Sequence, residues 1–195
     1  MNIDQAQHPA HDPVSLHTPQ AAGGLGPAFA RLVGTSDAIW PAILRVTLGG
    51  VLLPHALQKT LGWFGGFGFE KTMHWFTQQL HLPVALALLV IFTEQTASLA
   101  LLIGFCTRAA ALGVAAVMIG AVLTVHLQNG FFMNWFGNQP GEGFEFHLLV
   151  LAIVVALFVA GAGRWSVDRA LSRGDRLPRE RGVEPRGDAT AAAGS

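Results

Sequence analysis

Four long apolar segments, separated by polar, glycine-rich or aromatic connections, dominate the chain. They cover residues 38–56, 83–104, 109–127 and 144–162. Each has about 19–22 residues, and a helix rises 1.5 Å per residue, so each is long enough to cross the hydrocarbon core of a bilayer. The pattern predicts an all-α fold, a four-helix transmembrane bundle with up-down topology.

The connections between these segments differ sharply. Only a few residues separate the second and third segments, which predicts an antiparallel hairpin. The other two connections are longer and rich in aromatic residues, namely Trp63, Phe64, Trp75, Phe76, Phe131, Phe132, Trp135 and Phe136. Such rings typically anchor a protein at the membrane surface. Stacking against a ligand is the alternative interpretation.

Composition supports a membrane protein. Of 195 residues, 51% are hydrophobic and 12% charged, and the mean hydropathy is +0.44. The charged residues gather towards the two ends of the chain, where we expect disordered tails at residues 1–36 and 166–195 around a transmembrane domain at residues 37–165. The lone cysteine, Cys106, excludes an intramolecular disulfide.

Basic residues predict the orientation of the bundle. The arginines that flank the segments fall on one side of the expected membrane, and only Lys59 and Lys71 fall on the other. Those arginines are Arg31, Arg108, Arg164, Arg169, Arg173 and Arg176. The positive-inside rule then predicts that both termini are cytoplasmic and both aromatic connections face outward.

Ionisable residues inside the apolar segments are expected to face the bundle interior and to pair. Arg45 lies about 14 residues, or ~21 Å, below Lys59 on the first helix, and Glu94 lies ~16 Å below Pro83 on the second. Similar depths and opposite charges predict an Arg45–Glu94 ion pair. A purely structural pair that holds two helices together is the alternative.

Four further polar residues are expected to form one ring at the outer mouth of the bundle. His55 and Lys59 end the first helix, His126 ends the third, and Glu145 begins the fourth. Simpler roles are a Lys59 side chain that reaches the lipid head groups and a His126 that caps its helix. His147 lies about 200° around the helix from Glu145, so we expect it outside the ring, as a histidine with satisfied hydrogen bonds.

The order and spacing of several short motifs resemble the DoxX family of small four-helix membrane proteins. The resemblance covers about residues 37–170. It is carried by Arg45 with Gly49, "PHALQK" followed by "GWFGG", Glu94, "GFCTRAA", His126, Glu145 and "GAGRWSVDRA". Ala56 departs from the glycine that often follows the histidine in this family. The resemblance implies a bacterial cytoplasmic membrane protein, and some relatives are subunits of thiosulfate:quinone oxidoreductase or are linked to redox complexes that handle thiol stress.

These residues favour a subunit of a quinone-linked membrane oxidoreductase. A quinone head group needs hydrogen-bond donors and a source of protons. We expect His55, Glu94 and Glu145 as catalytic candidates and Arg45, Lys59 and His126 as cofactor-binding candidates, with no metal. The chain has no flavin, nicotinamide, iron–sulfur or c-type haem motif, so electrons would come from a partner subunit.

Other classes of function stay open from the sequence. They are a non-catalytic membrane anchor or assembly factor for a redox complex, and a small proton-coupled transporter. The chain could also form a homo-oligomer, and no feature points to nucleic acid.

Overall fold

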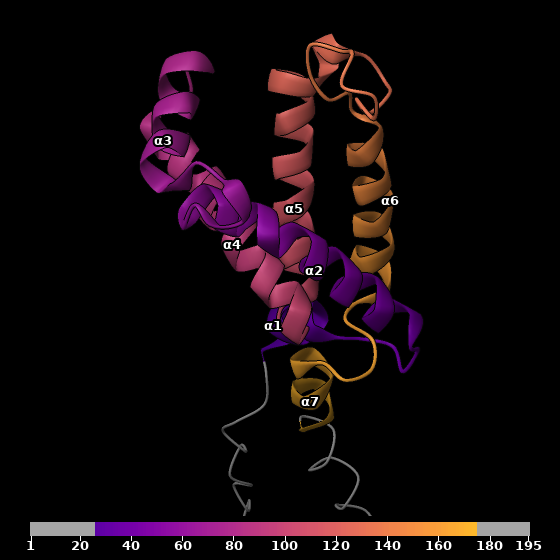
Figure 1. Ribbon diagram of the computed structural model, residues 1–195. Helices are drawn as coiled ribbons and strands as arrows, with labels where there is room; N and C mark the ends of the chain where they lie inside the picture. The colour runs from indigo at the N-terminus through magenta and orange to yellow at the C-terminus, as the bar shows by residue number, and fades with distance from the viewer. Residues whose placement is uncertain (1–25, 175–195) are drawn as a thin grey trace, which may run out of the picture.

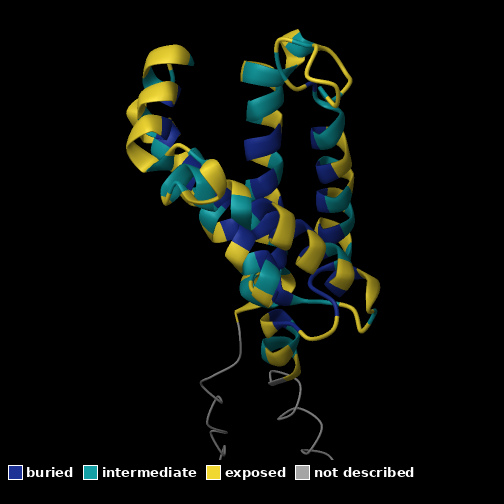
Figure 2. Ribbon diagram, viewed as in Figure 1, coloured by how far each residue is buried: buried dark blue, intermediate teal, exposed yellow. Residues whose placement is uncertain are grey.

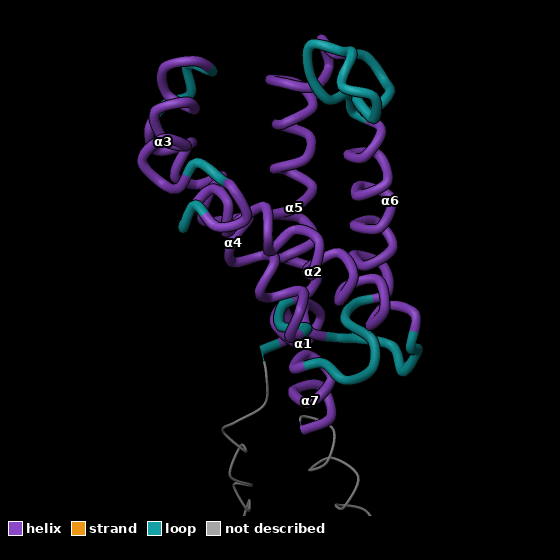
Figure 3. The backbone as a smooth tube through the Cα atoms, in the orientation of Figure 1, coloured by secondary structure: helices purple, strands orange, loops and turns teal. Residues whose placement is uncertain are grey.

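A computed structural model describes residues 26–174, and within them every regular element is helical (Figures 1 and 3). The α-helices are α1 Pro27–Val33, α2 Trp40–Thr60, α3 Gly68–His74, α4 Val84–Ile103, α5 Thr107–Ala121, α6 Glu145–Ala160 and α7 Val167–Gly174. Shorter turns are η1 Trp63–Gly65, η2 Trp75–Gln79, η3 Val122–His126 and η4 Leu127–Asn129. The all-α prediction is confirmed for the described residues.

Three helices are long and apolar enough to cross a membrane. They are α2, α4 and the continuous helix Thr107–Asn129, which joins α5 to η3 and η4. α6 is apolar but has 16 residues. Three of the four predicted segments are therefore candidate membrane-spanning helices in the structure, whereas the fourth span and the up-down topology stay predictions.

The core lies where α2, α4, α5 and α6 face one another (Figure 2). Its buried side chains include Leu52, Leu101, Val114 and Leu157. Large apolar side chains are exposed on the opposite faces of the same helices, as expected for helices in contact with lipid. The loop after α2, with α3 and η2, leads away from α5 and α6 (Figure 1).

Gly49 fixes how α2 and α4 pack. A Cβ atom at Gly49 would lie 2.9 Å from the Ser98 carbonyl oxygen and 3.0 Å from Leu102 Cγ, so only glycine allows this approach. Close backbone contact at small residues is the usual way in which helices associate in lipid. The contact sets the register, because it aligns the middle of α2 with the last turns of α4.

We expect Gly49→Ala to destabilise the bundle by about 1–3 kcal/mol, because the new methyl group would force the helices apart. Gly50→Ala is the matched control. No atom lies within 4 Å of a Cβ at Gly50, and alanine favours a helix by about 1 kcal/mol over glycine. Denaturant titrations of both variants in detergent would measure the difference, and equal losses would contradict this role of Gly49.

Arg45 joins three segments at the end of the bundle that holds α1 and α7, which we call the arginine end. Its guanidinium donates to the carbonyl oxygens of Leu101, Leu102, Ala162 and Trp165 at 3.0, 2.6, 3.0 and 2.5 Å, and to that of Arg164 at 3.3 Å. Arg45 is 2% exposed. It caps the last carbonyl groups of α4, where the helix dipole also favours a cation.

Two other side chains complete the arginine end. Arg108 donates to carbonyl oxygens of α1 and α6, among them Arg31 and Phe158, both at 2.9 Å. The Asp168 carboxylate accepts from the backbone N–H groups of Cys106 and Thr107 at 2.6 and 2.9 Å, so residue 168 caps the start of α5. Burial raises the pKa of the Cys106 thiol, and the charge of Asp168 raises it further, which keeps the thiol protonated.

The disordered-tail prediction is wrong for residues 26–36 and 166–174. α1 and α7 lie side by side at the arginine end (Figure 1), where Ser172 Oγ donates to the Val33 carbonyl oxygen at 2.8 Å and Arg169 forms an ion pair with Asp37. Both helices are short, and tertiary contacts rather than a long apolar pattern stabilise them. The remaining predicted tail residues, 1–25 and 175–195, lie outside the described residues.

Candidate functional site

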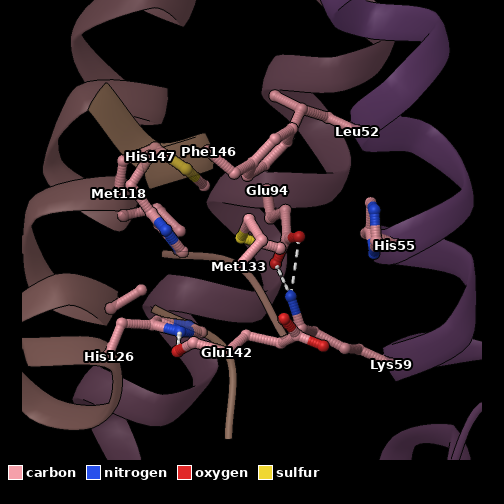
Figure 4. A pocket seen from close by; sticks show the side chains of 12 residues that line it. Leu52, His55, Lys59, Glu94, Met118, His126, Met133, Glu142, Phe146 and His147 are labelled. Carbon is pink, nitrogen blue, oxygen red and sulfur yellow. Dashed lines mark hydrogen bonds and ion pairs between the residues drawn. The ribbon is translucent and has the colours of Figure 1, made fainter. Parts of the chain in front are cut away.

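A cavity of about 250 Å³ lies at the other end of the bundle, which we call the cavity end. α2, α4, α5, η3, the loop at 130–144 and α6 all contribute to it (Figure 4). Its ionisable lining residues are His55, Lys59, Glu94, His126, Glu142 and His147. Leu52, Val117, Met118 and Phe146 supply apolar walls. Mostly apolar walls with a few convergent polar groups are typical of small-molecule sites.

An ion pair between α2 and α4 forms one wall. Lys59 Nζ donates to both carboxylate oxygens of Glu94, at 2.7 and 2.5 Å (Figure 4). The Glu94 side chain is 4% exposed and that of Lys59 is 33% exposed. Lys59 therefore points into the bundle and does not serve only to reach the lipid head groups. An ammonium group has three hydrogens, so one stays available for a ligand.

The predicted Arg45–Glu94 ion pair is wrong. Arg45 bonds to the end of α4, at Leu101 and Leu102, and Glu94 lies seven residues earlier, about 10 Å along the helix axis. The depth estimate assumed that α2 ends level with the start of α4. The Gly49 contact instead lets α4 extend beyond α2 by about a turn and a half. Arg45 lies at the arginine end, so its predicted cofactor-binding role is withdrawn.

His126 lies on the opposite wall, at the end of the π-helical turn η3. π-helical turns often occur at functional sites, because the extra residue changes the direction of the side chains that follow. His126 Nδ1 lies 2.8 Å from the Glu142 carbonyl oxygen (Figure 4). A carbonyl oxygen only accepts, so Nδ1 carries a hydrogen and Nε2 of the neutral ring is an acceptor. His126 thus binds the loop and also lines the cavity.

His147 is a second residue that sequence reasoning placed wrongly. It is 7% exposed, it lines the cavity, and its ring centroid lies 4.1 Å from that of His126. Its Nδ1 atom is buried without a hydrogen-bond partner, so its expected satisfied state is also wrong. One signal could have found it, because an ionisable residue inside an apolar helix usually faces the bundle interior.

Glu145 does not belong to the cavity, which corrects its predicted place in the ring. Glu145 begins α6, and its carboxylate accepts from the Met133 backbone N–H at 3.2 Å. A carboxylate at a helix N-terminus also interacts favourably with the helix dipole. Glu142, which was not among the predicted site residues, lines the cavity instead. Its carboxylate accepts from the Asn134 backbone N–H at 2.6 Å.

His55 lines the cavity as expected, from one turn before Lys59 on α2. Its side chain is exposed, so it lies at the rim. The structure therefore brings His55, Lys59, Glu94 and His126 together, adds Glu142 and His147, and leaves Arg45 and Glu145 elsewhere. Among residues 26–174, no three histidine, cysteine or acidic side chains are placed to hold a metal ion.

Comparison with known proteins identifies the domain. No curated protein and no solved structure matches the chain. The model of one protein family, DoxX, matches residues 40–127. The match begins at the first residue of α2 and ends one residue after η3. It includes the Lys59–Glu94 pair and His126. The chain therefore carries a DoxX domain at residues 40–127, a conclusion that agrees with its helices that are long and apolar enough to cross a membrane.

Proposed function

We propose that this protein is the integral membrane subunit of a quinone-linked oxidoreductase, and that its cavity binds the quinone head group. The observation that carries the proposal is the unpartnered Nδ1 of His147. A buried polar atom without a partner costs about 1–3 kcal/mol. A ligand oxygen that bonds to this nitrogen would remove that cost.

The cavity residues fit a ligand with an oxygen at each end. Lys59 has a free hydrogen on one wall, and the His126–His147 pair offers imidazole nitrogens on the other. Leu52, Val117 and Met118 offer an apolar surface between them. When bound, a quinone supplies the redox chemistry, because it takes up electrons together with protons. The chain's own residues orient its oxygens and hold protons close to them.

The bundle suits a ligand that is dissolved in lipid. The cavity lies between helices that are apolar enough to cross a membrane. Electrons would come from a partner subunit that oxidises a reduced sulfur compound or a thiol, as the family resemblance implies. We also propose that the protein lies in a bacterial inner membrane with the arginine end on the cytoplasmic side.

Photolabelling tests the proposal directly. A short-chain azidobenzoquinone, irradiated with the purified protein in nanodiscs, should label cavity residues such as Met118 and Met133, and excess unmodified quinone should reduce the labelling at least tenfold. His55→Trp should block labelling, because the indole would fill the rim. His74→Trp is the matched control, because His74 is exposed on α3 and does not line the cavity.

Peptide mass spectrometry would locate the label. Labelling spread over lipid-facing residues, without competition by quinone, would contradict the proposal. It would favour the alternative of a non-catalytic anchor or assembly factor. The Lys59–Glu94 pair joins α2 to α4 and would then serve only to hold the bundle together.

A further inference from the structure

We infer that His147 Nδ1 is the atom that exchanges a proton with the ligand, and that His126 positions its ring. The inference rests on the proposed function and specifies which residue contacts the reduced form of the ligand, a hydroquinone. His147 was not among the site residues predicted from the sequence. Three independent features of the structure do so.

The first feature is the free hydrogen-bonding capacity of His147. It is a cavity-lining residue, 7% exposed, and its Nδ1 has no partner. Neutral imidazole has one nitrogen that donates and one that accepts. Nδ1 itself is buried, so it can accept a hydrogen bond from a hydroxyl group of the ligand once the ring turns this nitrogen towards the cavity.

The second feature is the contact between the two rings. The His126 and His147 centroids are 4.1 Å apart, and the planes are tilted by 43°. Two positively charged rings at this distance would repel each other strongly, so the two rings do not carry an additional proton at the same time. The His126 ring is in turn held by the Glu142 carbonyl oxygen, 2.8 Å from Nδ1. His126 therefore supports the His147 ring from one side, and Phe146 packs edge-on against it at 5.8 Å.

The third feature is the set of charges around the pair. α2 presents Lys59 and, at the rim, His55; α4 presents Glu94; and the loop presents Glu142. Glu94 accepts from Lys59, and the Glu142 carboxylate accepts from a backbone N–H. Both carboxylates thus already accept hydrogen bonds from other groups. Apart from His55 at the exposed rim, the histidine pair is left as the group in the cavity that can gain or lose a proton as the ligand changes.

The proposed step moves a proton and no electron. In the oxidative direction, the O–H bond of one ligand hydroxyl breaks, an N–H bond forms at His147 Nδ1, and the electron pair of the broken bond stays on the ligand oxygen. The reverse step returns the proton. Electron transfer to or from the partner subunit is separate, and Lys59 holds the oxygen at the other end of the ligand.

Binding of a hydroquinone should therefore depend on pH through this pair. A protonated His147 ring has lost its acceptor nitrogen, so it cannot accept from the hydroxyl group. We expect the affinity for a short-chain hydroquinone, measured anaerobically by calorimetry in nanodiscs, to fall about tenfold from pH 6 to pH 3, because burial and the nearby charges of His126 and Lys59 oppose protonation of the His147 ring at higher pH. Nitrogen NMR of labelled histidines should show His147 Nδ1 accepting a hydrogen bond when the ligand is bound.

Variants separate a proton-exchanging role from a structural one. His147→Gln keeps a polar side chain but does not titrate, so its affinity should be weaker and independent of pH. His126→Gln should weaken binding less than His147→Gln does and should alter the pH profile. His74→Gln, at an exposed position outside the cavity, should behave as the unaltered protein does.

The outcomes are distinct. If hydroquinone binds with the same affinity at every pH, or if His147→Gln keeps the pH dependence, the inference is wrong and the proposed function stands. If neither the oxidised nor the reduced form binds at any pH, the proposed function fails and the inference with it.

Discussion

Lys59→Met should destabilise the protein by about 3 kcal/mol, because it leaves the Glu94 carboxylate buried without its partner. The effect should be asymmetric. Glu94→Gln should cost only about 1 kcal/mol, since the Lys59 side chain is one-third exposed and its ammonium group can turn towards water or lipid head groups. The free energy of unfolding, measured by SDS titration in mixed micelles, would give both values.

The double variant Lys59→Met/Glu94→Leu is the decisive control. Removal of both charges leaves no unpaired group, so its stability should return to within about 1 kcal/mol of the unaltered protein. Additive losses in the double variant would show that the two residues do not act as a pair. The double variant should nevertheless lose quinone labelling, because the free hydrogen of Lys59 is gone.

Arg45→Met should have the largest effect on stability, at least about 4 kcal/mol. Five carbonyl oxygens accept hydrogen bonds from the guanidinium and would lose this donor. They lie in a part of the fold where Arg45 itself is 2% exposed. Each buried group left unsatisfied costs about 1–3 kcal/mol. Arg45→Lys should recover only part of the loss, because an ammonium group cannot reproduce the planar guanidinium geometry.

The same variants test the corrected role of Arg45. Arg164→Met is the matched control at the arginine end, because the Arg164 side chain is exposed, and its effect should stay within about 0.5 kcal/mol. Any Arg45→Lys protein that folds should bind quinone with unchanged affinity, because the cavity lies at the other end of the bundle. A selective loss of quinone affinity would show that Arg45 contributes to ligand binding, against its structural role at the arginine end.

Much of the fold could be predicted because a bilayer imposes simple rules on length and polarity. The apolar segments, the short α4–α5 connection and the gathering of His55, Lys59 and His126 at one end all follow from helical rise and the cost of ionisable groups in lipid. Each of these properties can be worked out from one helix at a time, without knowing how the helices contact one another.

The relative register of the helices could not be predicted in this way. It depends on a contact between two helices, at Gly49 and Leu102, that no single helix reveals. The Arg45–Glu94 pair was predicted wrongly because the register between α2 and α4 was unknown. His147 was missed because its face was judged relative to Glu145, which binds the 130–144 loop and not the cavity. α1 and α7 were missed because contacts between distant parts of the chain stabilise them.

The arginine end has a consequence for biosynthesis. Arg45 needs carbonyl oxygens at residues 162–165, and the start of α5 needs the carboxylate of Asp168. A ribosome makes these partners after all four apolar segments. The Arg45 guanidinium and the first N–H groups of α5 therefore lack these partners until the segment after α6 has been translated. A chain halted before residue 168 should be a preferred substrate for membrane proteases.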